Sequence, residues 1–446
     1  MQVIDDVETA GFVPNRFLYN AALSKCAYQG RWREAMRLYK RMTSNHQIPA
    51  DVVTFSALIN ACGRGGRTDV GLALWEEMHE RKVQPNEFLY ASIISACGKG
   101  GPKYASTALS YYKEMSNSGL MPNVVVLSAV ISACEKGGKR YTDTALRLLD
   151  EMVTLDLKPD VIAFSAAMSA CEKGGSKYTE RALSLFGQMK QNRIRPNVYT
   201  FSALISACEK GGGKYTRKAL DLYAEMKRVK IDPNAVTYGA LISACEKGGG
   251  KYTQKAFELF DEMEVLGVKA DIIVFTALIS VCEKAGLASK AFELFHLMKA
   301  RGIRSDFAAY TSVIKASFDA EKYDQAHQLT RDAIAEGILE DLKGDKWDLH
   351  GLSEAFSCML LVDGIFKVSS VSDLNDIIVV TGKGVHTEDP DGPVLRERVP
   401  SFLCRVLGIE PTPVDGNDGR FIIKGEDLKE WANSERCKEI KAIFFD

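Results

Sequence analysis

Asp348 and His350, in the motif WDLHGL, have types and a spacing that could do chemistry. On a strand, residues two apart project from the same face, so we expect the two side chains to lie together. An imidazole beside a carboxylate can transfer a proton. His350 is therefore a candidate general base or acid, and Asp348 would orient the site or hold a metal. The competing interpretation is that Asp348 caps the next helix and His350 only packs locally.

A glycine loop, TGKG, follows the apolar run DIIVV and could hold a phosphate. The backbone N–H groups of a turn after a strand can approach an anion closely, and a lysine adds charge. Thr381, Gly382 and Gly384 are therefore candidate phosphate-binding residues, and Lys383 is a candidate catalytic cation. His386 is a further candidate. The competing interpretation is a loop that merely turns the chain.

Alternating strands and helices would position both motifs. Residues 347–368 predict a short strand and an amphipathic helix, 376–380 a buried strand, and 420–434 another strand and helix. A glycine loop and a helix would fill 381–408. Both motifs would then lie at the carboxyl ends of strands, the usual ligand edge of an open α/β sheet. We therefore predict a small α/β two-layer domain over residues 342–446.

The chain upstream of this tail is repetitive, with a period near 36 residues. SACEKGGGKYT occurs at 206–216 and again at 243–253. Eight cysteines follow the same period: Cys26, Cys62, Cys97, Cys134, Cys171, Cys208, Cys245 and Cys282. Ligands one repeat apart would not converge on one metal, and the sequence has no CxxC pair. Free thiols that serve as small buried residues fit better, and they indicate a reducing compartment.

One unit, residues 198–234, predicts a helical hairpin. Its first apolar stripe has helical spacing and consists of Val198, Phe201, Leu204, Ile205 and Cys208. Gly211 to Gly213 would end this helix, and Thr216 is a candidate N-cap for the second. The second stripe consists of Ala219, Leu220, Tyr223 and Met226. Pro233 would end that helix, and stacked hairpins of this kind form an all-α superhelical solenoid with a concave groove.

The pattern V-x-T-F-S-A-L-I-S-A-C-x-K-x-G…A-L-x-L-Y-x-E-M…x-P-N resembles the pentatricopeptide repeat family. Nine units cover residues 16–341, after a partial repeat at 1–15, and several are longer than the family's usual unit. The resemblance implies that each repeat faces one base of single-stranded RNA. It also implies that two residues choose the base: the fifth of the first helix and the last of the repeat.

The resemblance thus implies nine recognition pairs. They are Asn20 with Asp51, Ser56 with Asn86, Ala91 with Asn123, Ser128 with Asp160, Ser165 with Asn197, Ser202 with Asn234, Gly239 with Asp271, Thr276 with Asp306, and Thr311 with Asp341. Under the family's rule the target is 5′-U-A-n-G-A-A-n-G, with G at a ninth position if the last pair acts. That pair is weak because no proline precedes Asp341, and Ala91 and Gly239 offer no side-chain donor. The competing interpretation is that these residues are only caps and turns.

The second residue of each repeat is expected to clamp the base by apolar or aromatic contact. These residues are Phe17, Val53, Phe88, Val125, Ile162, Tyr199, Val236, Ile273 and Ala308. Every final residue is Asn or Asp and every fifth residue is small, whereas a protein-binding scaffold would vary there and carry large anchors.

The tail motifs, followed by P-V-L-R-x-x-V-x-x-F-L, resemble the small MutS-related (Smr) domain. Trp347 stands where that family has leucine, and the matching residues are Asp348, His350, Thr381, Gly382 and Gly384. Several members cut nucleic acid, so the resemblance implies endonucleolytic cleavage of the bound RNA. A divalent metal such as Mg²⁺ is a candidate cofactor, with unknown ligands. The alternatives are an RNA-stabilising factor with a non-catalytic tail and a protein-binding scaffold.

Composition limits the other classes of function. The net charge is −1 and 46% of residues are hydrophobic, so a globular protein that binds nucleic acid must use a local groove. We expect no membrane partner, because no apolar run approaches the roughly 18 residues of a span.

The family resemblance implies that the protein is located in a plastid or mitochondrion and has protein partners of organellar RNA metabolism. The chain is expected to start inside a repeat, without a targeting segment.

Overall fold

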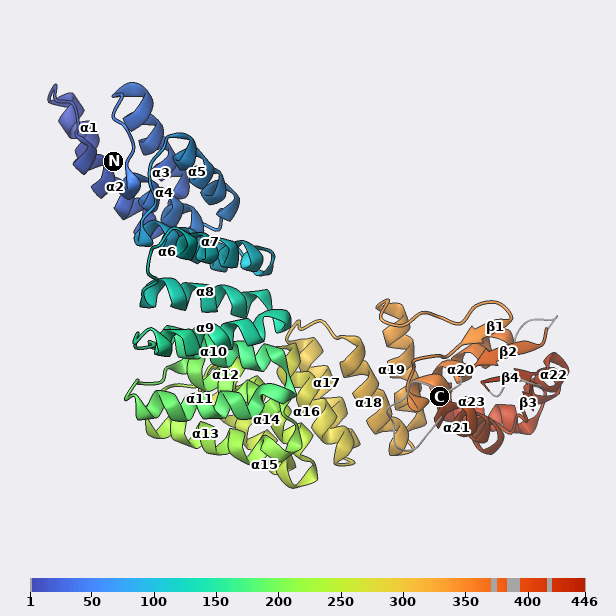
Figure 1. Cartoon of the computed structure of the whole chain (residues 1–446). Helices are drawn as coiled ribbons and strands as arrows, with labels where there is room; N and C mark the ends of the chain where they lie inside the picture. Colours follow the sequence, from blue (N-terminus) through green and yellow to red (C-terminus); the bar gives the residue numbers. More distant parts are fainter. Residues whose placement is uncertain (1, 370–374, 383–393, 415–418, 446) are drawn as a thin grey trace. The chain divides into compact units, whose positions relative to one another are not determined.

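The computed structural model describes residues 2–369, 375–382, 394–414 and 419–445. After α1 (Gln2–Thr9), nine helical hairpins follow one another (Figure 1). Their first helices are α2 (Arg16–Gln29), α4 (Val52–Arg64), α6 (Glu87–Lys99), α8 (Val124–Gly137), α10 (Val161–Gly174), α12 (Val198–Lys210), α14 (Ala235–Gly248), α16 (Ile272–Lys284) and α18 (Phe307–Asp319). Their second helices are α3 (Trp32–Lys40), α5 (Thr68–Glu80), α7 (Ala105–Asn117), α9 (Thr142–Thr154), α11 (Thr179–Gln191), α13 (Thr216–Arg228), α15 (Thr253–Val265), α17 (Ala288–Ala300) and α19 (Tyr323–Ala335). The predicted all-α solenoid of hairpins is confirmed.

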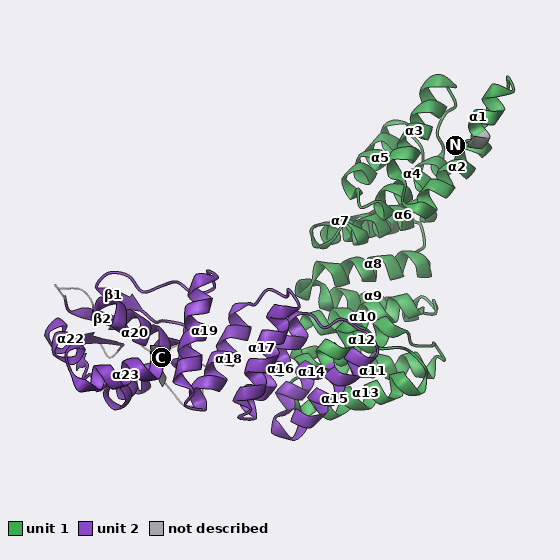
Figure 2. Cartoon of the chain, turned by 180° about the vertical axis from the view of Figure 1, so that it is seen from behind, with its two compact units in different colours: residues 1–240 green, residues 241–446 purple. Residues whose placement is uncertain are grey.

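The chain divides into two compact units, residues 1–240 and 241–446 (Figure 2). The tail therefore shares a unit with the last repeats. Within the described residues, no helix combines the length and the apolar character that a membrane span requires.

The apolar stripes and the cysteine ladder form the core of the hairpins. The predicted stripe of α12 is buried, except for half-buried Val198. In α13 the prediction needs one correction, because Leu222 is buried and Leu220 only half-buried. All eight ladder cysteines are buried free thiols, as expected. Burial raises the pKa of six of them, Cys97, Cys134, Cys171, Cys208, Cys245 and Cys282, to about 12.

A glycine and a short 3₁₀ turn join the two helices of five hairpins. The turns are Pro102–Tyr104, Lys139–Tyr141, Ser176–Tyr178, Gly213–Tyr215 and Gly250–Tyr252. Each follows a glycine in the left-handed region, such as Gly212 with φ 89°, a conformation that other residues rarely adopt.

The predicted N-cap role of Thr216 is wrong. Thr216 is the first residue of α13, and the cap position belongs to Tyr215, whose side chain makes no capping bond. The equivalent Thr179 donates its hydroxyl to the carbonyl oxygen of Ala207 in the next repeat, over 2.9 Å. The threonine at this position therefore joins neighbouring repeats.

The tail contains a four-stranded mixed sheet in the order β1-β2-β4-β3. Its strands are β1 (Lys346–Asp348), β2 (Ile377–Val380), β3 (Thr412–Pro413) and β4 (Arg420–Ile423). β1 and β2 are parallel, and β4 pairs antiparallel with β2 and β3. The helices are α20 (Glu354–Val368), α21 (Val394–Phe402) with a π turn at Leu403–Leu407, α22 (Gly425–Ala432) and α23 (Glu435–Phe445). The sequence did not predict β3.

Candidate functional site

The final residue of each of the first eight repeats caps the first helix that follows. Its Oδ1 accepts the backbone N–H of the residue three positions later, over 2.8–3.1 Å. The backbone of such a cap residue is extended, as at Asp51 with φ −117° and ψ −179°. The eight residues are Asp51, Asn86, Asn123, Asp160, Asn197, Asn234, Asp271 and Asp306. The cap interpretation is thus confirmed, but the cap uses only Oδ1. The second terminal atom, Nδ2 of Asn or Oδ2 of Asp, takes no part in it.

The fifth residues lie beside these caps. Asn20 donates through Nδ2 to Oδ1 of Asp51 over 3.2 Å. In the same way, the hydroxyl groups of Ser128 and Ser202 donate to Oδ1 of Asp160 (3.0 Å) and Asn234 (3.4 Å). The predicted partners are therefore brought together in these three repeats.

The remaining predicted residues lie at the same helix positions. Ser165 is hydrogen bonded to Thr200 over 2.8 Å, and Thr200 in turn belongs to the capping box of Asn197. Ser56, Ala91 and Thr276 are half-buried, and Gly239 is buried in α14. The hydroxyl of Thr276 is buried without a hydrogen-bond partner among the described residues, although such groups usually have one.

The carboxyl group of Asp51 is held in its charged form. Partial burial acts to raise the pKa of Asp51, but hydrogen bonds from Thr54 and Asn20 outweigh burial, and the pKa is lowered. Asp51 is therefore only an acceptor at neutral pH.

Large apolar side chains stand exposed at the second position of eight repeats. Phe17 is 81% exposed and Tyr199 is 72% exposed. The other six are Val53, Phe88, Val125, Ile162, Val236 and Ile273, all more than half exposed. In the ninth repeat the residue is Ala308. Exposed apolar side chains at one repeated position indicate a binding surface rather than scattered residues.

Two hollows show how these positions meet. One, of about 490 Å³, is lined by the pair Asn20 and Asp51 together with Phe17 and Val53. Another, of about 440 Å³, is lined by residues of four successive repeats. Among its lining residues are Ile162, Ser165, Asn197, Tyr199, Ser202, Asn234 and Val236. The fifth, last and second residues thus share one groove in these repeats.

A row of basic residues was missed in the sequence. Seven repeats in succession have an exposed Lys or Arg two residues after the ladder cysteine: Arg64, Lys99, Lys136, Lys173, Lys210, Lys247 and Lys284. Lys136 lines the hollow of about 440 Å³ that spans several repeats. Several are partly neutralised, as where Lys284 pairs with Glu246 over 2.5 Å. The cysteine spacing could have revealed this row, because it has the same period.

The ninth pair differs from the other eight. Asp341 caps no helix, and both its carboxylate oxygens accept from Lys367 Nζ, over 2.9 and 3.0 Å. The Thr311 hydroxyl donates to the carbonyl oxygen of Phe307 over 2.7 Å. The ninth repeat therefore lacks the helix cap that the final residue forms in the other eight.

In the tail, the two predicted motifs meet at the carboxyl ends of β1 and β2. Asp348 pairs with Val380 in the sheet, and the Leu349 N–H donates to the Val380 carbonyl over 2.9 Å. Gly382 has φ 81°, and a Cβ there would lie 2.8 Å from Cδ2 of His350. The His350 ring thus packs directly against the glycine turn.

The strand argument for Asp348 and His350 needs correction. β1 ends at Asp348, and His350 lies in the turn that follows. Oδ1 of Asp348 accepts the backbone N–H of His350 over 3.0 Å, while Ser353 caps α20. Asp348 therefore fixes the turn that carries His350, and it does not cap the helix.

The predicted phosphate loop is only partly within the described residues. Lys383, Gly384 and His386 lie outside them. Thr381 is buried, and both its N–H and its hydroxyl donate to the carbonyl oxygen of Gly419, over 2.9 and 3.2 Å. A phosphate at this turn would therefore meet Gly382 rather than Thr381.

No group of three or more His, Cys, Asp or Glu side chains gathers in the described part of the tail or elsewhere in the described ranges. Mg²⁺ is usually bound by one or two carboxylates together with waters and phosphate oxygens, so Asp348 stays a candidate ligand. No step is derived through a metal.

Three family models of the same repeat match this chain. They are the pentatricopeptide repeat domain (147–211, 213–247), the PPR repeat family (14–64, 50–99, 270–319) and the PPR repeat (236–268). Together they match more than half of the chain.

Two Arabidopsis thaliana relatives are similar over single segments. The pentatricopeptide repeat-containing protein At5g46580, chloroplastic, is 31% identical over 86 residues, which are 19% of this chain and 12% of that protein. At1g56690, mitochondrial, is 26% identical over 78 residues, which are 18% of this chain and 11% of that protein. The matches therefore span only a small part of each relative.

Among solved structures, the chain is similar in fold to the maize pentatricopeptide repeat protein PPR10. The crystal structure of PPR10 in complex with an 18-nt psaJ RNA element matches with a TM-score of 0.56 and 19% identity. The match covers 82% of this chain and 55% of PPR10.

Proposed function

Because this chain belongs to the pentatricopeptide repeat family, we propose that it binds single-stranded RNA in a sequence-specific manner through its repeat groove. The observation that carries the proposal is that the final Asn or Asp of a repeat has two terminal side-chain atoms and uses only one of them in the helix cap. Each caps a helix through Oδ1, which leaves the second terminal atom for a base beside an exposed apolar side chain. PPR10, whose fold is similar, has been crystallised with RNA.

Base selection in this proposal depends on the side-chain atom of the final residue that the helix cap does not use. In Asn234 the amide Oδ1 accepts the helix N–H, so Nδ2 is the donor that remains. In Asp160 the remaining Oδ2 can only accept. Asn and Asp therefore present opposite hydrogen-bonding groups to a base edge, as the family's rule requires. The proposed target is 5′-U-A-n-G-A-A-n-G.

The other two rows of the groove supply affinity. The exposed side chains at the second position, such as Phe17 and Tyr199, would stack against bases regardless of their identity. The basic row from Arg64 to Lys284 would neutralise phosphates, which explains how a chain of net charge −1 could bind RNA.

For the tail, the proposal is endonucleolytic cleavage of the bound RNA, on the resemblance to the Smr domain. The His350 imidazole would transfer a proton at the scissile phosphate, Asp348 would hold the turn in place, and the Gly382 turn would approach the phosphate. A repeat array that holds RNA raises the concentration of the strand near an attached site. The alternatives are an RNA-stabilising factor whose tail does not cut, and a protein-binding scaffold.

One experiment separates these three functions. Labelled RNA containing U-A-n-G-A-A-n-G is incubated at fixed salt with the wild type, with His350→Ala, and with His296→Ala as a control at an exposed histidine of α17. Cleavage lost only in His350→Ala supports the nuclease. Binding without cleavage supports the stabilising factor, and no binding supports the scaffold. Equal affinity for this RNA and for poly-C would contradict the base assignment.

The proposed location is a plastid or a mitochondrion, with partners in organellar RNA metabolism. It is supported by relatives that are named chloroplastic or mitochondrial. Fusion of the full-length protein to a fluorescent reporter would test it.

A further inference from the structure

The ninth repeat, formed by α18 and α19, differs from the others at all three positions that are proposed to contact a base: the second, the fifth and the last. Its second residue, Ala308, is too small to clamp a base. The Thr311 hydroxyl is bonded to its own helix, and Asp341 is paired with Lys367 instead of capping a helix.

The basic row also stops at this repeat. Two residues after Ser317, which stands at the position of the ladder cysteine, the chain has Asp319 where seven earlier repeats have Lys or Arg. A carboxylate there repels RNA phosphates rather than neutralising them.

Aromatic side chains of this repeat pack against the tail instead. The rings of Phe307 and Phe356 are stacked, with centroids 5.4 Å apart and planes 7° from parallel. Phe318 packs against Phe402 at 5.6 Å, and Tyr323 stacks on Phe444 at 6.1 Å. α20, α21 and α23 of the tail thus all contact this repeat.

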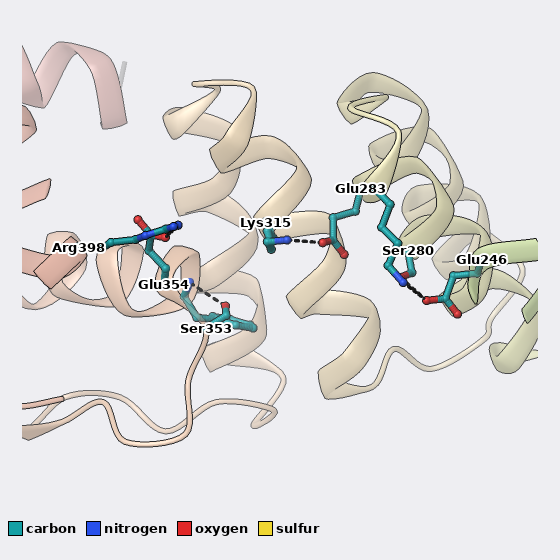
Figure 3. A network of polar contacts seen from close by, with 9 residues as sticks. Glu246, Ser280, Glu283, Lys315, Ser353, Glu354 and Arg398 are labelled. Carbon is teal, nitrogen blue, oxygen red and sulfur yellow. Dashed lines mark hydrogen bonds and ion pairs between the residues drawn. The ribbon is translucent and has the colours of Figure 1, made fainter. Parts of the chain in front are cut away.

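Polar contacts lie on both sides of this joint (Figure 3). Glu246 accepts from Ser280 of the next repeat over 3.3 Å, and Glu283 pairs with Lys315 over 2.5 Å. The next carboxylate, Glu354, belongs to α20 of the tail and pairs with Arg398 over 2.9 Å. The contacts between successive repeats thus reach Lys315 of the ninth repeat, and the pair beyond it lies within the tail.

Buried charges add to this joint. The ring of His327, on α19, lies 3.4 Å from a carboxylate oxygen of Asp363, on α20, and both residues are buried. Lys367 pairs with Asp363 over 2.5 Å as well as with Asp341. Charged groups buried in this way require fixed partners, so the packing of α20 on α19 is specific.

We infer that the ninth repeat is an adapter that holds the tail, so that base reading ends at the eighth pair, Thr276 and Asp306. The inference rests on the proposed function, because it specifies how many bases the groove selects. Helix α20 of the tail packs on both helices of the ninth repeat, and His327 and Asp341 of that repeat are paired with side chains of the tail.

The test compares two aspartates in the full-length chain, Asp306→Asn and Asp341→Asn. Binding is measured for U-A-n-G-A-A-n-G followed by each of the four bases, and with each base at the eighth position. Asp306→Asn should change the eighth-base preference from G to A by about tenfold in Kd and leave Tm unchanged, since Asn caps helices as well as Asp. Asp341→Asn should show no ninth-base preference beyond about twofold, and its Tm should fall by about 1–3 °C.

The inference is overturned if Asp341→Asn acquires a preference for A at the ninth base, or if its Tm equals that of the wild type. If none of the RNA oligomers binds to any variant, the proposed function fails. The Tm comparison, which needs no RNA, then still decides whether Asp341 serves the joint.

Discussion

At the scale of single residues, the final Asn or Asp of the first eight repeats caps a helix and, under the proposed function, also selects a base, two roles that the sequence presents as alternatives. Asp160 illustrates this, because one oxygen accepts from both the helix N–H and Ser128, while the other is outside the cap. A cap needs only one acceptor, and a base edge can use the second atom. The sequence could not separate the two interpretations, since both call for the same residue types at the same place.

Cysteine reactivity gives a prediction at this scale. Cys404 is exposed, whereas the other ten cysteines are buried. With a pKa raised to about 12, a ladder thiol such as Cys171 is ionised at pH 8 only to about one part in 10⁴. A thiol reagent should therefore label one site rapidly in the native protein, and Cys404→Ser should abolish that phase. Labelling in denaturant is the control and should reach all eleven cysteines. A second rapid site in the native protein would contradict the buried ladder.

At the scale of elements, the sequence predicts those helices and turns whose ends are set by the local residue pattern. Apolar spacing and glycine positions predict the hairpins, and the structure confirms them. The errors arise where a contact from another element decides. Thr216 has the type of an N-cap, but the 3₁₀ turn before it moves the helix start. His350 follows a strand that ends two residues earlier, because pairing with β2 extends only to Val380.

Two glycines in neighbouring helices allow a prediction about helix stability. A Cβ on Gly174, at the end of α10, would lie 2.4 Å from the ring of Tyr178 and 2.9 Å from Thr142. Gly174→Ala should therefore lower the free energy of unfolding by about 1–3 kcal/mol through overpacking. Gly187, inside α11, has open space around it, so Gly187→Ala should raise that free energy by up to about 1 kcal/mol. Chemical denaturation of both variants checks this pair. Equal effects of the two substitutions would show that helix propensity, and not the tyrosine contact, is decisive.

At the scale of the whole molecule, the tail is joined to the solenoid through its last repeat rather than through a free linker. No periodicity predicts this joint, because its contacts involve single residues such as Phe356 and Phe402 that belong to no repeat. The boundary near residue 342 stays a prediction, and the tail lies with the last repeats in the unit of residues 241–446. The helical hairpins of the solenoid were predictable from the sequence, but the packing of the tail against the last repeat was not.

Asp363 allows the strength of this joint to be measured through pH. Burial acts to raise the pKa of Asp363, but hydrogen bonds from His327 and Lys367 outweigh burial, and the pKa is lowered. A carboxyl group with a lowered pKa stabilises the fold fully above its unfolded value of about 3.9. That stabilisation is lost as the pH falls through the lower, folded value. Arg331, 3.9 Å away, acts in the same direction.

We expect Asp363→Asn to lower the free energy of unfolding by about 1–3 kcal/mol at pH 7, because charged hydrogen bonds to a buried carboxylate are lost. The difference from the wild type should begin to shrink below about pH 4, where the unfolded chain takes up the proton first, and should vanish only as the pH falls through the lower pKa of folded Asp363. Asp261→Asn, at an exposed carboxylate of α15, is the control and should differ little from the wild type at any pH. Thermal unfolding of the three proteins between pH 3 and 7 checks the prediction. A gap that persists undiminished at pH 3 would show that the shape of the Asp363 side chain, and not its charge, holds α20 against α19.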